Sequence, residues 1–138
     1  MAVSAISVGL AQGAFERAVR YAKERNAFGK CITEFQGVSF MLAEMEKQIE
    51  MGRCMLYNVA KLCDEGRPYS REAAILKLYT SEMADDVCRM AIQAMGANGI
   101  SEEYEVERFY RDNKLFTIGE GTSEICKMVI GRHVLRRY

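Results

Sequence analysis

The stretch that decides the fold is EFQGVSFMLAEMEKQIEMGRCMLYNVAKLCDE, residues 34–65, which contains no proline and repeats apolar or small residues at alternating steps of four and three. The repeated positions are Val38, Leu42, Met45, Ile49, Gly52, Leu56, Val59 and Cys63. This spacing is typical of the seam along which a helix packs against nearly antiparallel neighbours. We therefore predict one long helix over residues 34–65, set in a helical bundle.

Two further stretches carry the same rhythm. The seam in residues 70–95 follows Ser70, a candidate N-cap, and runs through Ala73, Leu76, Thr80, Met83, Val87, Met90 and Ala94. The seam in residues 2–25 runs through Val8, Ala11, Phe15, Ala18 and Ala22. Turn-forming segments at 26–33, 66–68 and 96–99 separate these helices, and shorter helices are expected at 103–113 and 122–136. The sequence predicts an all-α protein, an up-down four-helix bundle with a short extra helix before the last one.

The composition limits the classes of function. At 138 residues the chain has the length of one domain, and 49% hydrophobic with 28% charged residues is ordinary for a globular protein. Its 19 basic and 19 acidic residues cancel, so no overall field would gather nucleic acid, and no apolar stretch is long enough to span a membrane. The chain enters a helical pattern directly at Met1, without a signal peptide, which suggests a domain cut from something longer.

The cysteines and the histidine do not suggest a metal site. The five cysteines are an odd number, and none forms a Cys-x-x-Cys pair: Cys31, Cys54, Cys63, Cys88 and Cys126. We interpret them as reduced, mostly buried thiols in a cytosol-like compartment. The single histidine, His133, fits a surface or helix-end position, because no other residues with ligand spacing accompany it. We predict no metal.

Function must be sought in the turns, because rigid helices hold polar groups there. The last turn, Gly119-Glu120-Gly121-Thr122, places a carboxylate between two glycines just before a helix. The glycines permit close approach of a ligand, and amide groups at the start of the helix can bind a carbonyl oxygen or a phosphate. Glu120 is therefore a candidate base. On the residues alone, a glutamate that only complements the helix dipole is the favoured alternative.

Five short motifs follow one another along the chain. They are Arg25-Asn26-Ala27-Phe28-Gly29-Lys30, Phe35-Gln36, Gln93-Ala94-Met95-Gly96-Ala97-Asn98-Gly99, Tyr110-Arg111-Asp112 and Glu120-Gly121-Thr122-Ser123-Glu124-Ile125. Their order and approximate spacing resemble those of acyl-CoA dehydrogenases, and similarity at 8–12 and 40–45 extends the match over essentially the whole chain. Residues 1–138 thus resemble the carboxy-terminal helical domain of that family, without its amino-terminal helical and middle β-barrel domains.

The resemblance implies FAD-dependent α,β-dehydrogenation of acyl-CoA thioesters. In the family, the glutamate that Glu120 matches removes the α-proton while the β-hydrogen leaves as hydride to flavin N5. The backbone N–H of that glutamate polarises the thioester carbonyl, and Gly121 falls among the substrate contacts. A carboxylate is a weak base in water, so an acyl chain that excludes water must strengthen it. The isolated chain is expected to be inactive.

The resemblance also implies two sets of FAD contacts. Arg25, Ala27, Phe28, Phe35 and Gln36 are expected at the cofactor of a neighbouring subunit, and Gln93, Ala94, Gly96 and Ala97 at its adenosine half. Thr122 and Glu124 are expected over the cofactor of their own subunit. A pyrophosphate needs a cation such as Arg25. Taken alone, residues 25–29 read as a helix end with a glycine cap, and residues 96–99 as an ordinary turn.

The partners implied by the resemblance are an acyl-CoA substrate, an electron-transferring flavoprotein and further copies of the chain in a dimer of dimers. The implied location is the cytoplasm in a bacterium or archaeon, which we prefer, or the mitochondrial matrix in a eukaryote. Two alternatives stay open. One is an acyl-CoA oxidase, and the other is a non-catalytic helical oligomerisation module.

Three positions depart from the common family pattern. Gly119 stands where an aromatic residue is frequent, Phe35 where histidine is frequent, and Ala97 where glycine is frequent. Gly119 matters most because it borders the candidate base, and we expect it to widen the acyl pocket there. Arg111 and Asp112 are interpreted as a structural ion pair without a catalytic role.

Overall fold

The computed structural model describes all 138 residues and contains five α-helices. These are α1 (Ala2–Glu24), α2 (Gln36–Asp64), α3 (Ser70–Met95), α4 (Val106–Ile118) and α5 (Ser123–Arg137). The connections hold three 3-10 turns, η1 (Ile32–Glu34), η2 (Gly96–Ile100) and η3 (Glu102–Tyr104), and a hairpin of β1 (Asn26–Ala27) and β2 (Lys30–Cys31). The predicted all-α fold is confirmed. None of the helices is both long and apolar enough to cross a membrane.

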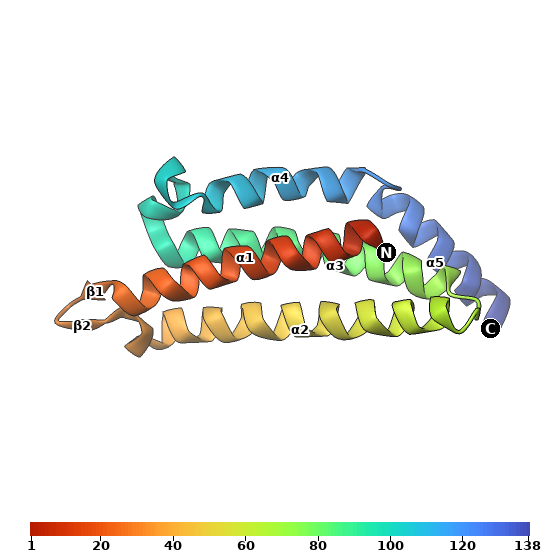
Figure 1. The fold of residues 1–138 in the computed structure, drawn as a ribbon, viewed down its shortest axis with the longest axis horizontal. Helices are drawn as coiled ribbons and strands as arrows, with labels where there is room; N and C mark the ends of the chain where they lie inside the picture. The colour runs from red at the N-terminus through yellow and green to blue at the C-terminus, as the bar shows by residue number, and fades with distance from the viewer.

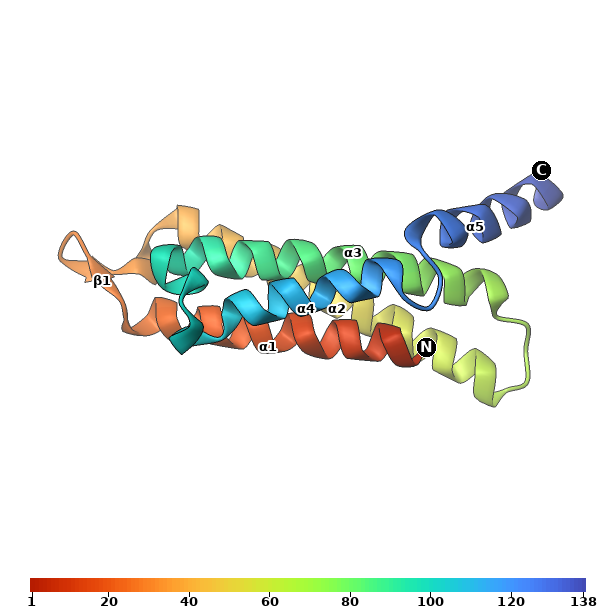
Figure 2. The same ribbon diagram turned by 90° about the horizontal axis from the view of Figure 1, so that it is seen from above.

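The helices α1, α2 and α3 run alternately up and down, and α4 lies along α1 and α3 (Figure 1, Figure 2). The helix expected at 103–113 is therefore a full member of the bundle, and it extends further toward its carboxyl end. By contrast, α5 contacts α3 and then leaves the bundle at an angle (Figure 2). The turn between α4 and α5 consequently lies beside the start of α1.

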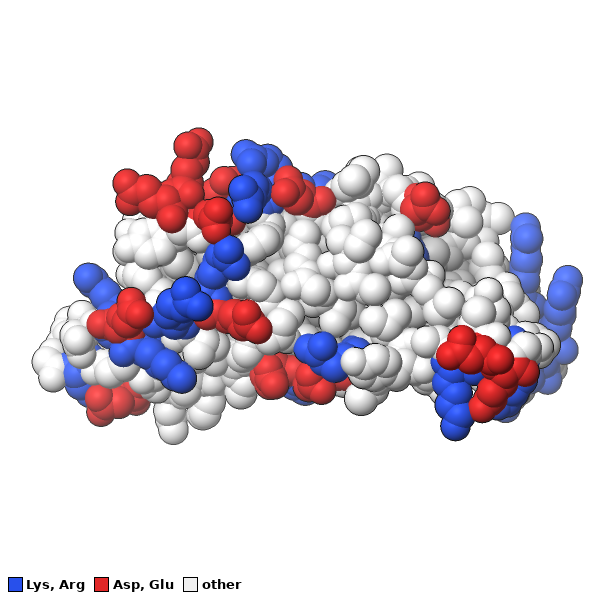
Figure 3. Space-filling model, viewed as in Figure 1, with Lys and Arg blue, Asp and Glu red and all other residues white.

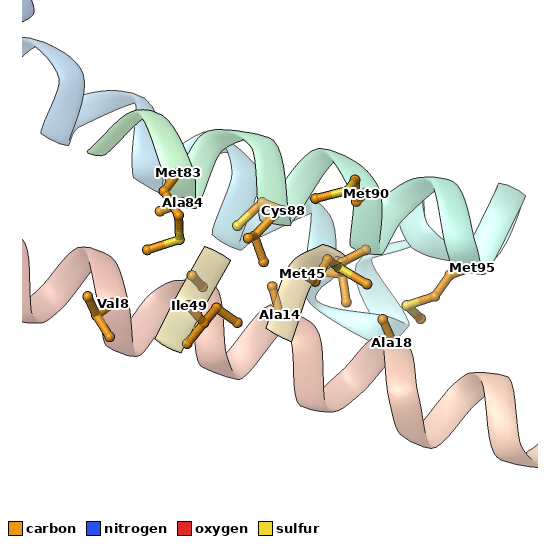
Figure 4. Packing of buried hydrophobic residues seen from close by; sticks show 14 residues of the cluster. Val8, Ala14, Ala18, Met45, Ile49, Met83, Ala84, Cys88, Met90 and Met95 are labelled. Atoms are coloured by element: carbon orange, nitrogen blue, oxygen red, sulfur yellow. The ribbon is translucent and has the colours of Figure 1, made fainter. Parts of the chain in front are cut away.

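The core lies between α1, α2 and α3, and its side chains come from the predicted seams. Four alanines of α1 are fully buried at steps of three and four: Ala11, Ala14, Ala18 and Ala22. Because each carries only a methyl group, α1 can approach α3 closely, and Met45 and Ile49 of α2 fill the remaining space (Figure 4). Burying a side chain as large as Met45 or Ile49 stabilises the fold by about 1.5–3 kcal/mol.

The start of α2 and the N-cap of α3 differ in detail from the sequence-based expectations. The helix α2 begins at Gln36 because residues 32–34 form a separate 3-10 turn, in which the Glu34 carboxylate accepts a hydrogen bond from the Cys31 backbone N–H at 3.2 Å. Phe35 is extended, with φ −87° and ψ 125°, so it interrupts the helical path. Ser70 is the first residue of α3, and Tyr69 holds the cap position in its place.

The segment expected as a turn at 26–33 forms a short hairpin. Asn26 pairs with Cys31 and Ala27 with Lys30, and the two residues at its tip, Phe28 and Gly29, have φ of 52° and 81°. Positive φ at both central residues is the hairpin turn whose twist matches the flanking strands. Glycine adopts it freely, whereas Phe28 does so at some conformational cost.

Ion pairs at the start of α4 differ from the expected pattern. Arg17 of α1 donates to the Glu105 carboxylate at 2.7 Å, and this hydrogen bond, with the charge of Arg108, holds the pKa of Glu105 below its ordinary value. Glu105 has φ 61° and precedes the first turn of α4. Arg111 pairs with Glu107, one helical turn earlier, at 3.5 Å. The predicted pair of Arg111 with Asp112 is wrong, because Arg111 pairs instead with the carboxylate four residues earlier on the same face of α4.

The cysteines are less buried than expected. All five are free thiols, but only Cys88 and Cys126 are buried, Cys31 and Cys63 are half-buried, and Cys54 is exposed. Burial raises the pKa of the Cys88 thiol to about 12, so that group stays protonated and unreactive. Cys54 is not a position of the predicted seam, and it lies on the solvent-facing side of α2. The prediction of mostly buried thiols is therefore wrong for this chain.

Two glycine substitutions test the packing of the fold in opposite directions. A Cβ at Gly99 would lie 2.6 Å from the backbone oxygen of Ile92, so Gly99→Ala is expected to lower the free energy of unfolding by about 1–3 kcal/mol. A Cβ at Gly9 meets nothing within 4 Å, so Gly9→Ala inside α1 is expected to raise it by about 0.5–1 kcal/mol. Urea denaturation of the 138-residue chain measures both. Equal effects of the two changes would contradict the close contact between η2 and α3.

Candidate active site

The turn between α4 and α5 has an unusual backbone path. The Gly119 N–H closes α4 by donating to the Leu115 carbonyl oxygen at 2.7 Å. Glu120 and Gly121 then follow with φ of 56° and 99°. A left-handed conformation costs a residue with a side chain about 1–2 kcal/mol, so Glu120 is held there by the rest of the turn. Glu120 is exposed on this turn.

Thr122 fixes the other side of this turn. It is the N-cap of α5, and its side-chain oxygen accepts a hydrogen bond from the Ile125 backbone N–H at 3.4 Å. Hydrogen bonds from its own backbone N–H and from the Thr122 hydroxyl hold the pKa of Glu124 below its ordinary value. The carboxylate of Glu124 is therefore committed to capping α5. Glu120 has no such partner and is the free carboxylate of the turn.

A cavity of about 530 Å³ opens beside the turn. Its walls come from the start of α1, the first turns of α3, the turn itself and α5, and they are mostly apolar, with Ala73, Ile125 and Val129 among them. Glu120 and Gly121 line it from the turn. An apolar chain that entered this cavity would exclude water from beside a carboxylate, and that is the environment in which a carboxylate can remove a proton from carbon.

The predicted cofactor residues of the first two motifs lie at the opposite end of the bundle. Arg25, Gln36 and Phe28 are exposed, and the Phe28 ring is 96% exposed at the hairpin tip. The rings of Phe28 and Phe35 meet edge to face with centroids 6.2 Å apart, and Lys30 Nζ lies 4.3 Å from the centroid of Phe35. Ala27 belongs to β1 and is half-buried. Arg25 has no ion-pair partner in the chain.

The third motif lies at this same end, where α3 runs into η2. Gln93, Gly96 and Ala97 are exposed, and Ala94 is half-buried. Gly96 has φ 60° and ends α3, as its predicted turn character required. Asn98 anchors the segment by donating to the Tyr21 hydroxyl of α1 at 2.9 Å. The exposed groups thus sit on a backbone that is tied to the bundle.

The structure therefore separates the predicted residues into two groups. The start of α1 lines the Glu120 cavity and Arg25 follows its end, so the two groups are about 35 Å apart along a helix with a rise of 1.5 Å per residue. One dinucleotide cannot reach both groups of one chain. On the face seen in Figure 3, charged side chains gather toward both ends of the molecule, and much of the area between them is uncharged.

The hairpin end fits an anionic aromatic cofactor. Arg25 and Lys30 supply cations without carboxylate partners, and Phe28 and Phe35 supply flat apolar cover. The other end fits an apolar substrate beside a base, with Thr122 and Glu124 at the edge of the same turn. The residues present thus suit the two halves of a flavin site, provided that different chains supply them.

One residue of the cavity was missed by sequence analysis. Lys77 of α3 lines the cavity together with Glu120, and it is only 7% exposed. Its position could have been noticed, because it follows Ala73 by four residues and precedes Ser81 by four, both on the inward side of α3. A lysine within such a face is unusual, since charged side chains are rarely fully buried without a partner.

Comparison with known proteins assigns the chain. Residues 1–135 match the sequence profile of the carboxy-terminal domain of acyl-CoA dehydrogenases. The chain belongs to the acyl-CoA dehydrogenase family. It is 47% identical over 136 residues to the probable acyl-CoA dehydrogenase YngJ of Bacillus subtilis, and 43% identical over 137 residues to the CarC subunit of the caffeyl-CoA reductase-Etf complex of Acetobacterium woodii.

A solved acyl-CoA dehydrogenase structure has the same helical arrangement. The butyryl-CoA dehydrogenase of Megasphaera elsdenii superposes with a TM-score of 0.95 at 44% identity, over 97% of this chain and 35% of that one. The two curated relatives are likewise matched over 99% of this chain and 36% of their own length. The chain thus spans about a third of the length of the acyl-CoA dehydrogenases that it matches.

The strained conformation of Glu120 leads to a testable trade-off. Glu120→Gly removes the cost of a left-handed glutamate, and the greater freedom of the unfolded chain offsets only part of this gain. We expect the free energy of unfolding of the 138-residue chain to rise by about 0.5–1 kcal/mol, measured by urea denaturation. Glu120→Gln keeps the backbone preference and should leave stability unchanged. A loss of stability in the glycine variant would mean that the carboxylate makes a stabilising contact.

Proposed function

We propose that this chain is the carboxy-terminal domain of an FAD-dependent enzyme that dehydrogenates acyl-CoA thioesters between the α- and β-carbons. The observation that carries the proposal is Glu120, a carboxylate without a partner on a strained, glycine-flanked turn at the edge of an apolar cavity. The remaining two thirds of its relatives' length would correspond to an amino-terminal helical domain and a middle β-barrel domain.

The proposed reaction begins with proton transfer to Glu120. Its carboxylate takes the α-proton and becomes a carboxylic acid, while the electrons of the C–H bond move toward the thioester carbonyl. The Glu120 N–H is suited to stabilise the resulting charge on the carbonyl oxygen, with Gly121 leaving room for the thioester. Bound FAD would supply the acceptor for the β-hydrogen as hydride. Apolar walls around the acyl chain keep water away from the base.

The cofactor would be held by two chains at once. Thr122 and Glu124 belong to the cofactor site of their own chain, whereas Arg25, Phe28, Phe35 and the segment 93–97 would reach the cofactor of a neighbour. The roughly 35 Å between the two groups supports this division. It also requires an oligomer, which we propose to be a dimer of dimers.

A relative and one position of the turn support a proposal for the electron acceptor and for the shape of the acyl pocket. The name of CarC places that relative in a complex with an electron-transferring flavoprotein, and we assign such a flavoprotein as the acceptor here. Gly119 has φ −71° and does not line the cavity, and a Cβ there would lie 3.2 Å from the Leu115 carbonyl oxygen, so the wider acyl pocket expected from the missing aromatic side chain stays a prediction. Hydrogen peroxide formation by the complete enzyme in air would instead indicate an oxidase.

The role of Glu120 is tested in the complete enzyme that carries this domain with its flavin-binding domains. Glu120→Gln is expected to lower kcat by about 10²–10⁴-fold, because only the base is neutralised. The visible flavin absorbance and acyl-CoA binding should stay near those of the parent enzyme. The matched control is Glu46→Gln, an exposed carboxylate of α2 that belongs to neither group of predicted site residues and should keep full activity. Near-normal turnover in the Glu120 variant would place the base elsewhere.

The division of the cofactor site predicts the behaviour of the 138-residue chain alone. Without the β-barrel domain, we expect it to bind FAD weakly and to turn over little or no acyl-CoA, because it holds only part of each site. Titration of FAD fluorescence and a dye-reduction assay measure the two properties. Robust dehydrogenase activity of the isolated chain would contradict the proposal that other domains complete the site.

A further inference from the structure

Lys77 is the buried charged residue that the proposed chemistry does not yet use. Its side chain projects from α3, is 7% exposed, and has its Nζ removed from solvent without any hydrogen-bond partner. Four buried side-chain polar atoms in the chain lack a partner, and Lys77 Nζ is the only one on a charged residue; the others are Ser4 Oγ, Ser7 Oγ and Asn113 Oδ1. In native proteins a buried charged group usually has a hydrogen-bond partner or a charge of opposite sign nearby.

The surroundings of Lys77 leave few candidates for its partner. The cavity that it lines is bordered by α1, α3, the catalytic turn and α5, and α2 and α4 contribute no side chain to it. The other titratable groups in the lining are the Met1 amino group, the Cys126 thiol and the carboxylate of Glu120. Glu120 is therefore the only anion among them.

The remaining charges nearby are already engaged. Glu124 of α5 feels the charge of Lys77, but its carboxylate is hydrogen-bonded within the cap of α5. Lys127 of α5 lies 3.7 Å from the Glu82 carboxylate of α3. Among the side chains that line the cavity, Lys77 and Glu120 are the only two that carry charges of opposite sign. No ion pair within 4.0 Å joins them.

We propose that Lys77 is a positioning residue for Glu120. Its buried ammonium attracts the carboxylate and directs it toward the space where the acyl chain binds. This inference rests on the proposed function of Glu120. It explains why α3 carries a lysine on an inward face, where an apolar side chain would cost less.

The test is Lys77→Met in the complete enzyme, because methionine keeps the length of the side chain and removes the charge. The acid limb of the pH profile of kcat/KM is expected to move upward by about one pH unit, with a smaller change on the plateau. Lys77→Arg should restore most of the parent profile, since it restores the charge. Lys127→Met is the matched control, because it removes one exposed lysine from the same end and should leave the profile unchanged.

A thermal unfolding curve separates this role from a structural one. Replacing an unpartnered buried charge by an apolar side chain of similar size should leave Tm unchanged or raise it. A lower Tm with an unchanged pH profile would overturn the proposal, because Lys77 would then only pair with another part of the fold. Failure of the proposed function gives a different result. In that case Glu120→Gln retains turnover, whatever Lys77→Met does.

Discussion

The close packing of α1 on α3 is the contact on which the rest of the structure depends. A row of buried alanines brings the two helices together, and their combined surface is the platform on which α4 lies. Because α4 packs on both helices, the turn that follows it, which carries Glu120, lies beside the first residues of α1 and the first turns of α3. A bulkier residue at Ala14 or Ala18 would separate the helices and shift the turn. The geometry of the candidate base is thus set by methyl groups far from it along the chain.

The helices could be predicted from sequence because a seam of period 3.5 leaves few other structures open. Residues 70–95 were predicted with the bounds of α3, since breakers flank them on both sides. It was harder to predict from sequence which helix packs as the fourth member of the bundle. The pattern around residues 103–113 is short, and only the packing of α4 on two other helices decides where it lies. The hairpin at 26–31 was also missed, because two-residue strands leave no periodic signal.

In the candidate site, too, the sequence did not predict features that depend on how the helices pack together. The resemblance of the turn motifs to the family indicated Glu120, Thr122 and Glu124, whereas the residues alone favoured a glutamate that only complements the helix dipole. Lys77 directly follows Leu76 of the predicted seam but is not one of its positions, so the seam itself gave no reason to expect it to be buried. Its burial, and its place opposite Glu120, depend on which helix faces close around it. The exposure of Cys54 likewise depends on how wide the buried face of α2 is, which periodicity alone does not fix.

The position of the hairpin has a consequence for genetics. In the proposed assembly each chain would supply the base for one site and the exposed hairpin for another, so defects in the two ends would complement each other. A mixed dimer of one chain defective at Arg25 and one defective at Glu120 would contain one intact site and one that is doubly defective. Two inactive alleles could therefore restore activity when they are expressed together, which a site built within one chain would not allow.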